Sequence, residues 1–382
     1  MSTGRPAILY VIDNLEFGGG ERGFVQLAAA LHGRYRIVFA CAPGGVLAER
    51  LPALGVRIHP IPFHRQISLR RLRRLAAVIR AERVDLVHSM GARADVATRL
   101  AARLTGVPVV STIAMFAERF DVSRPRRLVY RLLSRTTERM CAGLIAESDA
   151  IRTTLIRDHG LPAARVVRIY RGVELDDGPG AAEATEQLRA SLGLPARAPV
   201  VGTVGRLVYQ KAQDVFLRAA ALVLQEIPEA RFLVVGDGPQ APALERLRGQ
   251  LGLDGACRFT GFRRDVAALL GVMDVFTLPS ILEGFPQVLL EALAQSRPVV
   301  ATRIDGVTEL IEDGVNGRLV PPGDAAALAA ALIELLQDRA QAGKLAQTGR
   351  RQVEEQFSVT RMVQDVEAFY QSVLRGSGRH AG

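Results

Sequence analysis

Short apolar runs alternate with amphipathic stretches along the first half of the chain. The runs are residues 7–12, 36–41, 84–89, 107–113 and 143–148. The stretches between them space their apolar residues as helices do. Alternating strands and helices favour a parallel sheet that is covered by helices on both faces. The first half is therefore expected to fold as a doubly wound α/β domain.

The same alternation starts again in the second half. Its apolar runs are residues 199–205, 230–238, 257–261, 275–280 and 297–302, and residues 324–374 have the pattern of consecutive helices. This pattern predicts a second Rossmann-like, doubly wound domain. Ligands of such sheets bind at the carboxyl ends of the strands, so the predicted ligand site is a central cleft between two facing sheets.

A chain of 382 residues with 48% apolar content exceeds what one core usually organises, which also favours two domains. Residues 174–199 are rich in Ala, Gly and Pro and lack a strand pattern, so we expect the interdomain linker there. The expected divisions are an N-terminal domain, a linker with a C-terminal domain, and a last helix that packs back on the N-terminal domain. They span residues 1–175, 176–357 and 358–382.

Neither the start of the chain nor its cysteines indicate export. Residues 1–13 lack the basic and long apolar segments of a signal peptide, and no run of about 18 apolar residues follows. Cys41, Cys141 and Cys257 are far apart in the sequence, which indicates neither a disulfide framework nor a zinc site. We therefore expect a cytoplasmic protein that does not span a membrane.

Positive charge is concentrated in the first half. Residues 1–173 contain 28 arginines and 13 acidic residues, a balance of +15, whereas the remainder contains 21 basic and 26 acidic residues, a balance of −5. Such a basic half needs an anionic partner or a large solvated face. Nucleic acid is disfavoured as that partner, because the chain has no Trp and only 5% aromatic residues for stacking on bases.

The strongest candidate site follows the apolar run 275–280. Pro286 suits the first position of a helix, which would place the amides of Glu283, Gly284 and Phe285 at a helix N-terminus, where anions are favoured. Glu291 lies further along that helix. The two carboxylates are expected to serve different ends of one extended ligand, one end a sugar and the other a ribose. A carboxylate suits a ribose because it can accept hydrogen bonds from two vicinal hydroxyls at once. The alternative is a loop carboxylate with a solvated helix residue.

A second candidate site follows the run 199–205. Gly205, Arg206 and Lys211 lie on a loop that leads from a strand into a helix. An Arg and a Lys on such a loop can both reach a diphosphate and stabilise a departing nucleoside diphosphate. Lys211 is notable because Lys344 is the only other lysine of the chain. The alternative is a solvated charged loop.

Other glycines and a phenylalanine follow further strands. Gly236, Gly238 and Phe262 come after two strands of the second half and are expected to form the base pocket. Gly19 and Gly20 open a helix after the first strand, where glycine permits close approach to a ligand. That loop is not a clean G-x-G-x-x-G and no acidic residue ends the second strand, which disfavours a nicotinamide cofactor.

His88 ends a predicted strand of the first half. Two roles are open for it, an acid–base or hydroxyl-binding residue and a histidine hydrogen-bonded at a strand end. No Asp-x-Asp lies at a strand end with the geometry that nucleotide-bound Mg²⁺ needs. We therefore expect no essential metal and no cofactor.

Together these motifs resemble family 4 of the retaining glycosyltransferases, which have the GT-B fold, over essentially the whole chain. The resemblance is carried by Gly18-Gly19-Gly20-Glu21-Arg22, Gly205-Arg206-Leu207 with Lys211, Gly236-Asp237-Gly238-Pro239, Glu283 with Glu291, and Asp313-Gly314-Val315-Asn316-Gly317. It implies metal-independent transfer of a sugar from a nucleoside-diphosphate sugar with retention of anomeric configuration. It also implies that the domains close over the donor.

By matching positions, the resemblance places Arg206 and Lys211 on the diphosphate. It places Glu291 on the ribose, and Glu283 with the amides of Gly284 and Phe285 on the donor sugar. UDP is the first choice of nucleotide and GDP the second. The expected acceptor is a glycan or lipid-linked glycan of cell-surface polysaccharide or lipopolysaccharide synthesis. Alternatives are a GT-B epimerase or phosphorylase, and a non-catalytic protein whose basic half binds a membrane or nucleic acid.

The chain departs from the family pattern on the acceptor side. Many members carry a His shortly after the strand that matches residues 107–113, and this chain has Ala114 and Met115 there. Met90 also stands where a second His is usual near His88. A catalytic His therefore cannot be transferred to this sequence. A front-face reaction remains open if the leaving phosphate takes the acceptor proton.

Two arginine-rich stretches bear on where the acceptor is met. Arg127, Arg131, Arg135 and Arg139 recur every four residues, and residues 68–83 set an apolar face against the five arginines from Arg70 to Arg80. A basic amphipathic surface suits an anionic membrane. This leads to the hypothesis of peripheral attachment to the inner face of the cytoplasmic membrane. The alternative is arginine-rich solvent faces with leucines packed inward.

Overall fold

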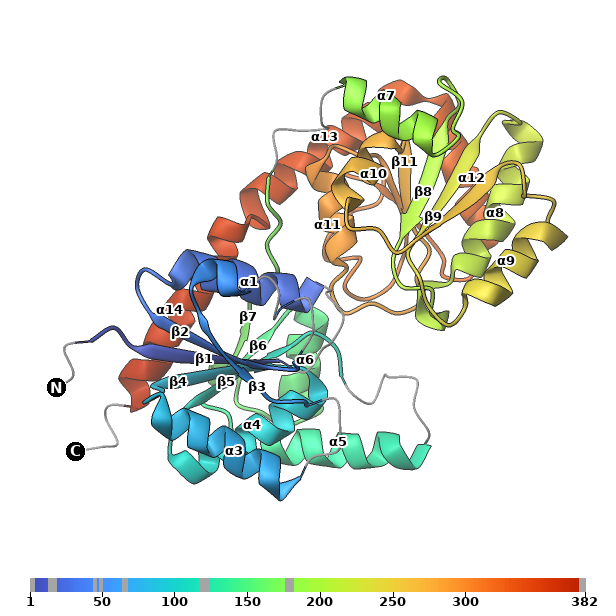
Figure 1. Cartoon of the computed structure of the whole chain (residues 1–382). Coiled ribbons are helices and arrows are strands. Elements are labelled where there is room, and N and C mark those ends of the chain that lie inside the picture. Colours follow the sequence, from blue (N-terminus) through green and yellow to red (C-terminus); the bar gives the residue numbers. More distant parts are fainter. Residues whose placement is uncertain are drawn as a thin grey trace. The chain divides into compact units, whose positions relative to one another are not determined.

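The first sheet carries helices on both faces. The computed structural model describes residues 4–12, 19–43, 47, 51–63, 68–116, 124–175 and 182–377. Contacts divide the chain into a first unit, residues 1–172 with 359–382, and a second unit, residues 173–358 (Figure 1). These limits differ by a few residues from those expected, and each unit is an α/β structure with a parallel sheet.

Seven described strands form the sheet of the first unit, in the order β3-β2-β1-β4-β5-β6-β7. They are β1 (Ala7–Ile12), β2 (Arg36–Cys41), β3 (Arg57–Pro60), β4 (Leu86–Met90), β5 (Val109–Ile113), β6 (Gly143–Ala146) and β7 (Val166–Arg168). The helices are α1 (Gly19–Leu31), η1 (Leu51–Leu54), α3 (Leu69–Ala81), α4 (Ala92–Thr105), α5 (Arg124–Glu138), α6 (Asp149–Arg157), η3 (Ala163–Arg165) and α14 (Val359–Ser377).

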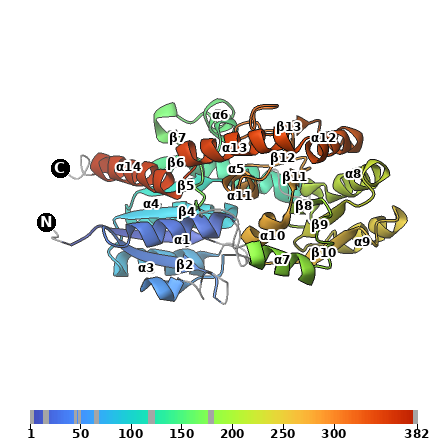
Figure 2. The same ribbon diagram turned by 90° about the horizontal axis from the view of Figure 1, so that it is seen from above.

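Strand β1 shows how the sequence builds the two layers of this unit. Leu9 and Val11 point to the face that α3, α4 and α6 cover, whereas Ile8, Tyr10 and Ile12 point to the face that α1 and α14 cover. Successive side chains of a strand alternate between faces, so a strand buried on both sides is apolar throughout. Figure 2 shows α1 and α14 on the same side of this sheet, and they contact each other.

The second unit has six described strands in the order β10-β9-β8-β11-β12-β13. They are β8 (Val200–Val204), β9 (Arg231–Val235), β10 (Cys257–Gly261), β11 (Val275–Leu278), β12 (Val299–Thr302) and β13 (Arg318–Val320). The helices are α7 (Ala182–Ser191), η4 (Tyr209–Lys211), α8 (Gln213–Glu226), α9 (Ala241–Gln250), α10 (Val266–Val272), α11 (Gln287–Ala294), α12 (Ala325–Gln337) and α13 (Arg339–Gln356). The two parallel, helix-covered sheets confirm the predicted doubly wound fold class.

Several elements differ from the expectation. The strands β3, β7 and β13 were not predicted, and each is an edge strand of three or four residues. Helix α7 lies within the region expected to hold the linker and contacts α10.

The three cysteines are free and buried. No helix in the described part of the chain is long and apolar enough to cross a bilayer.

Both sheets have a point where the strand order reverses. In the first sheet the chain runs outward from β1 to β3 and then crosses to β4 on the other side of β1, and in the second sheet it does the same between β8 and β11. Loops at the carboxyl ends of such neighbouring strands diverge and leave a crevice, which is the usual ligand site of open α/β sheets.

Candidate active site

A buried ion pair lies at the switch point of the second sheet. Lys211 ends η4 after β8, and Glu283 lies in the loop after β11. The Lys211 Nζ is 2.6 Å from the Glu283 Oε1, and the Ser280 hydroxyl donates to the same oxygen at 2.6 Å. The Ile281 amide donates to the Gln210 carbonyl at 2.9 Å, which ties the two loops together. The structure thus brings two of the predicted catalytic residues into contact.

Burial sets the electrostatics of this pair. Glu283 is only 8% exposed, whereas the Lys211 side chain keeps 22% of its surface exposed. A buried carboxylate needs a cation and hydrogen-bond donors to stay charged, and Lys211 with Ser280 supplies both. The Lys211 ammonium is also a point charge that an anion can approach from solvent. Arg206 is exposed on the same loop, and its carbonyl accepts a hydrogen bond from the Gln213 side chain at 3.0 Å.

The predicted base-pocket glycines hold two loops together by close backbone packing. A Cβ placed on Gly236, where φ is +130°, lies 1.9 Å from the Gly205 carbonyl oxygen, and one on Gly238 lies 2.5 Å from the Leu207 oxygen. The amides of Gly205 and Leu207 donate to carbonyls of the β9 end. These glycines therefore shape the site through the backbone. Phe262 follows β10 and is 63% exposed. Its contact with the base of the nucleotide stays a prediction.

Gly306 supports the Glu283 loop and was missed in the sequence. Its φ is +77°, and a Cβ placed on it lies 2.2 Å from the Gly284 carbonyl oxygen. No larger residue fits there without moving the loop that carries Glu283. The Asp305-Gly306 dipeptide is a turn signal, but its contact with Gly284 is long-range and leaves no local trace.

Helix α11 begins at Gln287, one residue later than expected, with Pro286 as its N-cap and no side-chain cap. The Pro286 prediction is wrong by that one position, because its ψ of 95° is still extended. Phe285 is buried, with its ring centroid 6.0 Å from that of Phe357, so its backbone rather than its ring is suited to a ligand. Glu291 lies half-buried in the second turn of α11.

The motif Asp313–Gly317 forms a turn. Asn316 donates to the Leu310 carbonyl and accepts from the Glu312 amide, each at 2.8 Å, and the Asp313 carboxylate accepts from the Leu319 amide at 3.0 Å. These bonds tie both side chains to backbone groups that flank the turn, which gives this motif a structural role.

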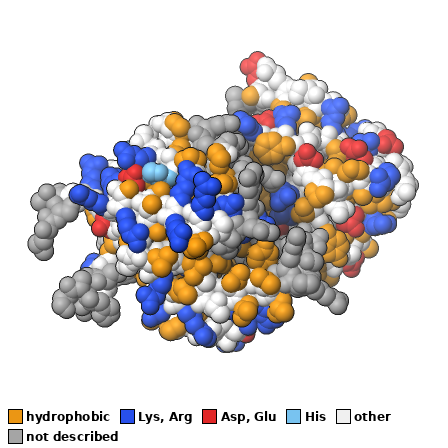
Figure 3. All heavy atoms as spheres, turned by 60° about the horizontal axis from the view of Figure 1, so that its bottom comes forward, with side chains coloured by type: hydrophobic (Ala, Val, Ile, Leu, Met, Phe, Trp, Pro, Cys, Tyr) orange, Lys and Arg blue, Asp and Glu red, His pale blue; other side chains and the backbone are white. Residues whose placement is uncertain are grey.

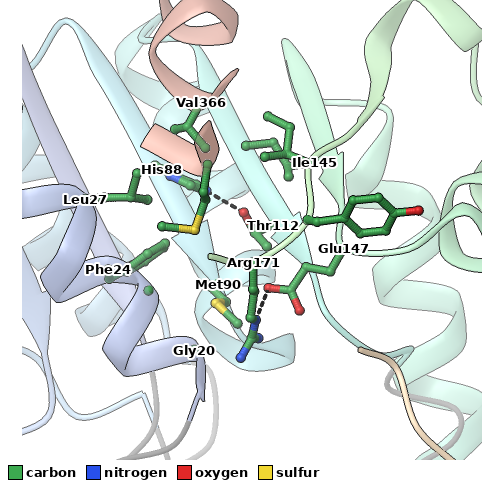
Figure 4. A pocket seen from close by; sticks show the side chains of 14 residues that line it. Gly20, Phe24, Leu27, His88, Met90, Thr112, Ile145, Glu147, Arg171 and Val366 are labelled. Carbon is green, nitrogen blue, oxygen red and sulfur yellow. Dashed lines mark hydrogen bonds and ion pairs between the residues drawn. The ribbon is translucent and has the colours of Figure 1, made fainter. Parts of the chain in front are cut away.

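A pocket lies at the carboxyl end of the first sheet, at its switch point (Figure 4). Its apolar lining comes from α1, β4, β6 and α14, and includes Phe24, Met90, Ile145, Met362 and Val366. Gly20 lets α1 approach β4, because a Cβ placed there lies 2.5 Å from the Met90 Cε. Gly19 begins α1, and residues 13–18 of the predicted glycine loop lie outside the described residues.

His88 lines this pocket but is 1% exposed, with both ring nitrogens hydrogen-bonded. Its Nδ1 contacts the Tyr370 hydroxyl of α14, and its Nε2 lies 2.7 Å from the Thr112 hydroxyl. Burial lowers the pKa of His88 to about 3, so the ring is neutral at physiological pH. This geometry favours the structural alternative; an acid–base or acceptor-binding role stays a prediction.

An ion pair at the pocket was missed in the sequence. The Arg171 Nε is 2.7 Å from the Glu147 Oε1, and the two side chains are 12% and 5% exposed (Figure 4). Glu147 follows β6 directly, so its position after a predicted strand was a usable signal. Arg171 follows β7, whose strand was not predicted. The pair is the main polar group beside the apolar lining of this pocket.

Within the described ranges, no group of three or more His, Cys, Asp or Glu side chains is arranged to hold a metal ion. Metal independence of the reaction stays a prediction. The expected cleft between the carboxyl ends of the two sheets is also still a prediction.

The two doubly wound units define the class of protein, a GT-B glycosyltransferase. A crystal structure of Anabaena Alr3699/HepE in complex with UDP-glucose is similar to this chain with a TM-score of 0.85 and 25% identity, covering 96% of this chain and 99% of that one. The fold of WaaG, a glycosyltransferase involved in lipopolysaccharide biosynthesis, is also similar, with a TM-score of 0.75 over 95% of this chain and 99% of that one, at 17% identity.

Sequence comparisons identify the family. The model described as Glycosyltransferase Family 4 matches residues 17–177, and the one described as Glycosyl transferases group 1 matches residues 198–338. A 2-deoxystreptamine glucosyltransferase of Streptomyces kanamyceticus is 30% identical over 72% of this chain and 73% of its own length. The Escherichia coli UDP-Gal:alpha-D-GlcNAc-diphosphoundecaprenol alpha-1,3-galactosyltransferase is 28% identical over 88% of this chain and 89% of its own. The chain belongs to the family 4, group 1 glycosyltransferases and is a transferase enzyme, as the resemblance predicted.

Proposed function

We propose that this enzyme transfers a hexose from a UDP-sugar, with retention of anomeric configuration, to a glycan or lipid-linked glycan of cell-surface polysaccharide or lipopolysaccharide synthesis. The observation that carries the proposal is the contact of Lys211 with Glu283 at the switch point of the second sheet. A cation beside a carboxylate at this position supports the recognition of a sugar diphosphate, which needs both. UDP-glucose in the HepE structure and the undecaprenol acceptor in the name of the E. coli relative support the choice of substrates.

In the proposed reaction the bond between the anomeric carbon and the diphosphate breaks, and the acceptor oxygen bonds to the same face of that carbon. The acceptor proton passes to an oxygen of the leaving diphosphate, so no protein base is needed. Lys211 and Arg206 offset the charge that develops on the diphosphate. Glu283 accepts hydrogen bonds from the donor sugar, and Glu291 accepts them from the ribose hydroxyls.

On the acceptor side, the pocket at the first sheet is the proposed site. Its apolar lining suits the C–H face of a sugar ring, while Arg171 and Glu147 offer a donor and an acceptor of hydrogen bonds. The absence of a His at Ala114 and Met115 is compatible with the phosphate-assisted reaction. An acceptor that is lipid-linked would place the enzyme at the inner face of the cytoplasmic membrane.

The test combines donor and acceptor. The purified enzyme is incubated with UDP-glucose, UDP-galactose or GDP-mannose, with and without a short-chain polyprenyl-diphosphate sugar, and free nucleotide and the anomeric configuration of the product are measured. Acceptor-dependent release of UDP and an α-linked product from an α-linked donor support the proposal. Release without acceptor, or inversion, contradicts it. The Glu283→Gln variant should lose transfer, whereas Glu245→Gln, at an exposed position of α9, should not.

A further inference from the structure

Helix α5 exposes a cluster of apolar side chains, whereas the other arginine-rich helix of the first unit buries most of its apolar face. Leu128, Val129 and Leu132 of α5 are 66%, 54% and 63% exposed. In α3, Leu75 and Ile79 are buried in the core, Leu72 is partly buried, and Leu69 at the start of the helix is 59% exposed. Inward packing of leucines, the alternative weighed for both stretches, therefore explains the α3 pattern beyond its first residue and leaves α5 unexplained.

The C-terminal end of α5 is fixed to the unit by polar contacts. Glu138 accepts from the Ser134 hydroxyl at 2.7 Å and lies 2.6 Å from the His159 Nδ1, and the Thr137 hydroxyl accepts from the buried Arg99 at 3.3 Å. One side of the helix thus faces the protein. The exposed leucines lie in the first half and the middle of the same helix, so the fold holds them outward on a firmly attached helix.

Cations accompany these apolar residues. Arg131 on α5 and Arg139, one residue past its end, are exposed. The helix ends at Glu138, so the prediction that Arg139 lies within it is wrong by one residue, and the Arg127 side chain lies outside the described residues. Figure 3 shows apolar side chains gathered beside arginines on the face of the first unit that α3, α4 and α5 cover.

We infer that this α5 surface, defined by Leu128, Val129, Arg131, Leu132 and Arg139, docks on a bilayer that contains anionic lipid. Apolar side chains that enter the acyl boundary and arginines at headgroup level are the two components of interfacial binding. The positive balance of residues 1–173 adds long-range attraction to a negative membrane surface. A nucleic acid would use the arginines but leave three exposed apolar side chains in contact with phosphates or water. The inference rests on the membrane location in the proposed function and names the surface responsible.

Vesicle binding tests the inference. Co-sedimentation is measured with pure phosphatidylcholine vesicles and with vesicles that contain an equal part of phosphatidylglycerol, at low salt. We expect binding to the second kind only, and at least roughly tenfold weaker binding by the Leu128→Ser/Leu132→Ser double variant, because each leucine loses its transfer out of water. Leu222→Ser, at a partly exposed leucine of α8, is the matched control and should bind as the unchanged enzyme does. Equal binding by the double variant, or none by the unchanged enzyme, overturns the inference.

The lack of tryptophan allows a direct test of contact. In Leu132→Trp the new indole is the only one in the chain, and we expect its fluorescence to shift to the blue and to be quenched by brominated phospholipid. Leu222→Trp should show neither change. Transfer to a water-soluble acceptor should be unaltered in the Leu128→Ser/Leu132→Ser variant. If this variant alone lost transfer, a role of the α5 surface confined to docking would be contradicted. If the unchanged enzyme also showed no transfer, the proposed function would be contradicted and not the docking surface.

Discussion

Lys211 shows how a single side chain can be singled out by the composition around it. Apart from Lys211 itself and Lys344, every basic residue of the chain other than His is an arginine. An ammonium is a compact charge, whereas a guanidinium is a planar fork. In the structure the Lys211 ammonium meets the Glu283 carboxylate at 2.6 Å, and the Lys211 side chain runs past Gly205. A single point charge suits this one-to-one contact.

We predict that Lys211→Arg lowers kcat/KM for transfer by about 10²-fold, close to the effect of losing one electrostatic stabiliser of a transition state. A planar guanidinium on a shorter stem would place its charge and its hydrogen bonds differently beside Glu283. Lys344→Arg is the matched control, because it makes the same change at an exposed position of α13. Initial rates of UDP release with acceptor measure both. Equal activity of the two variants would show that charge alone matters at Lys211.

His88 leads to a prediction about stability, not activity. Burial lowers the pKa of His88 from 6.5 to about 3, so below pH 6.5 the unfolded chain binds one proton more than the folded chain. The stability that the neutral ring contributes is therefore complete above pH 6.5 and is lost as the pH falls towards 3. The free energy of unfolding of the first unit should fall by about 1.4 kcal/mol per pH unit in this window.

The measurement is hydrogen exchange of the most protected amides of β1 and β4, which report unfolding of this unit. It is made between about pH 6.5 and pH 4.5, on the unchanged enzyme and on His88→Gln, whose side chain does not titrate. The free energy of unfolding should change less steeply with pH in His88→Gln, by about 1.4 kcal/mol per pH unit. His32→Gln, at an exposed histidine of the first unit, should leave the slope of the unchanged enzyme nearly as it is. Identical slopes for the enzyme and His88→Gln would contradict the neutral, buried state of this ring.

At the scale of elements, the loop that carries Glu283 depends on a glycine from another loop. Gly306→Ala places a methyl group 2.2 Å from the Gly284 carbonyl oxygen and must displace the loop. Gly323→Ala makes the same change at a nearly equal φ, +80° against +77°, with nothing within 4 Å. Both variants bear a backbone strain of about 1 kcal/mol. Only Gly306→Ala should also lose UDP-sugar binding, measured by calorimetry; equal loss in both would assign the effect to strain alone.

Elements in the interior of the sheets could be predicted from the sequence, and so could the five-residue edge strand β10, whereas the three shorter edge strands could not. Strands such as β1 and β8 are buried on both faces and therefore read as continuous apolar runs. The edge strands β3, β7 and β13 have three or four residues with partly exposed side chains, so neither an apolar run nor an alternation is long enough to detect.

The same distinction governs the candidate site. Lys211 and Glu283 follow interior strands, and their place after those strands identified them. Arg171 follows the edge strand β7, which was not predicted. Gly306 lies in a recognisable turn, but its contact with Gly284, about twenty residues earlier, leaves no local trace. The position of His88 at a strand end could be predicted but its role could not, because its partner Tyr370 comes from the far end of the chain.

At the scale of the whole molecule, the first unit is discontinuous in sequence. The second unit interrupts it in the sequence, and helix α14, which follows the second unit, completes the core of the first. Met362, Val363, Val366 and Tyr370 of this helix are buried in the cluster that includes β1 and α1. Residues of this kind contribute roughly 1.5–3 kcal/mol each when buried. Together they approach the whole stability of a domain, which is about 5–15 kcal/mol.

We therefore predict that a chain ending at Ser358 loses the fold of the first unit and keeps that of the second. Without α14 the apolar face of β1 and α1 is open to water, and His88 loses the Tyr370 hydroxyl. Transfer to acceptor should be abolished, whereas UDP binding, measured by calorimetry, should persist because Lys211, Glu283 and Glu291 all belong to the second unit. A chain ending at Ser377, which retains α14, is the control and should behave as the full chain does. If the chain ending at Ser358 still transferred sugar, α14 would be dispensable for the first unit; if it lost UDP binding as well, the donor site would depend on more than the second unit.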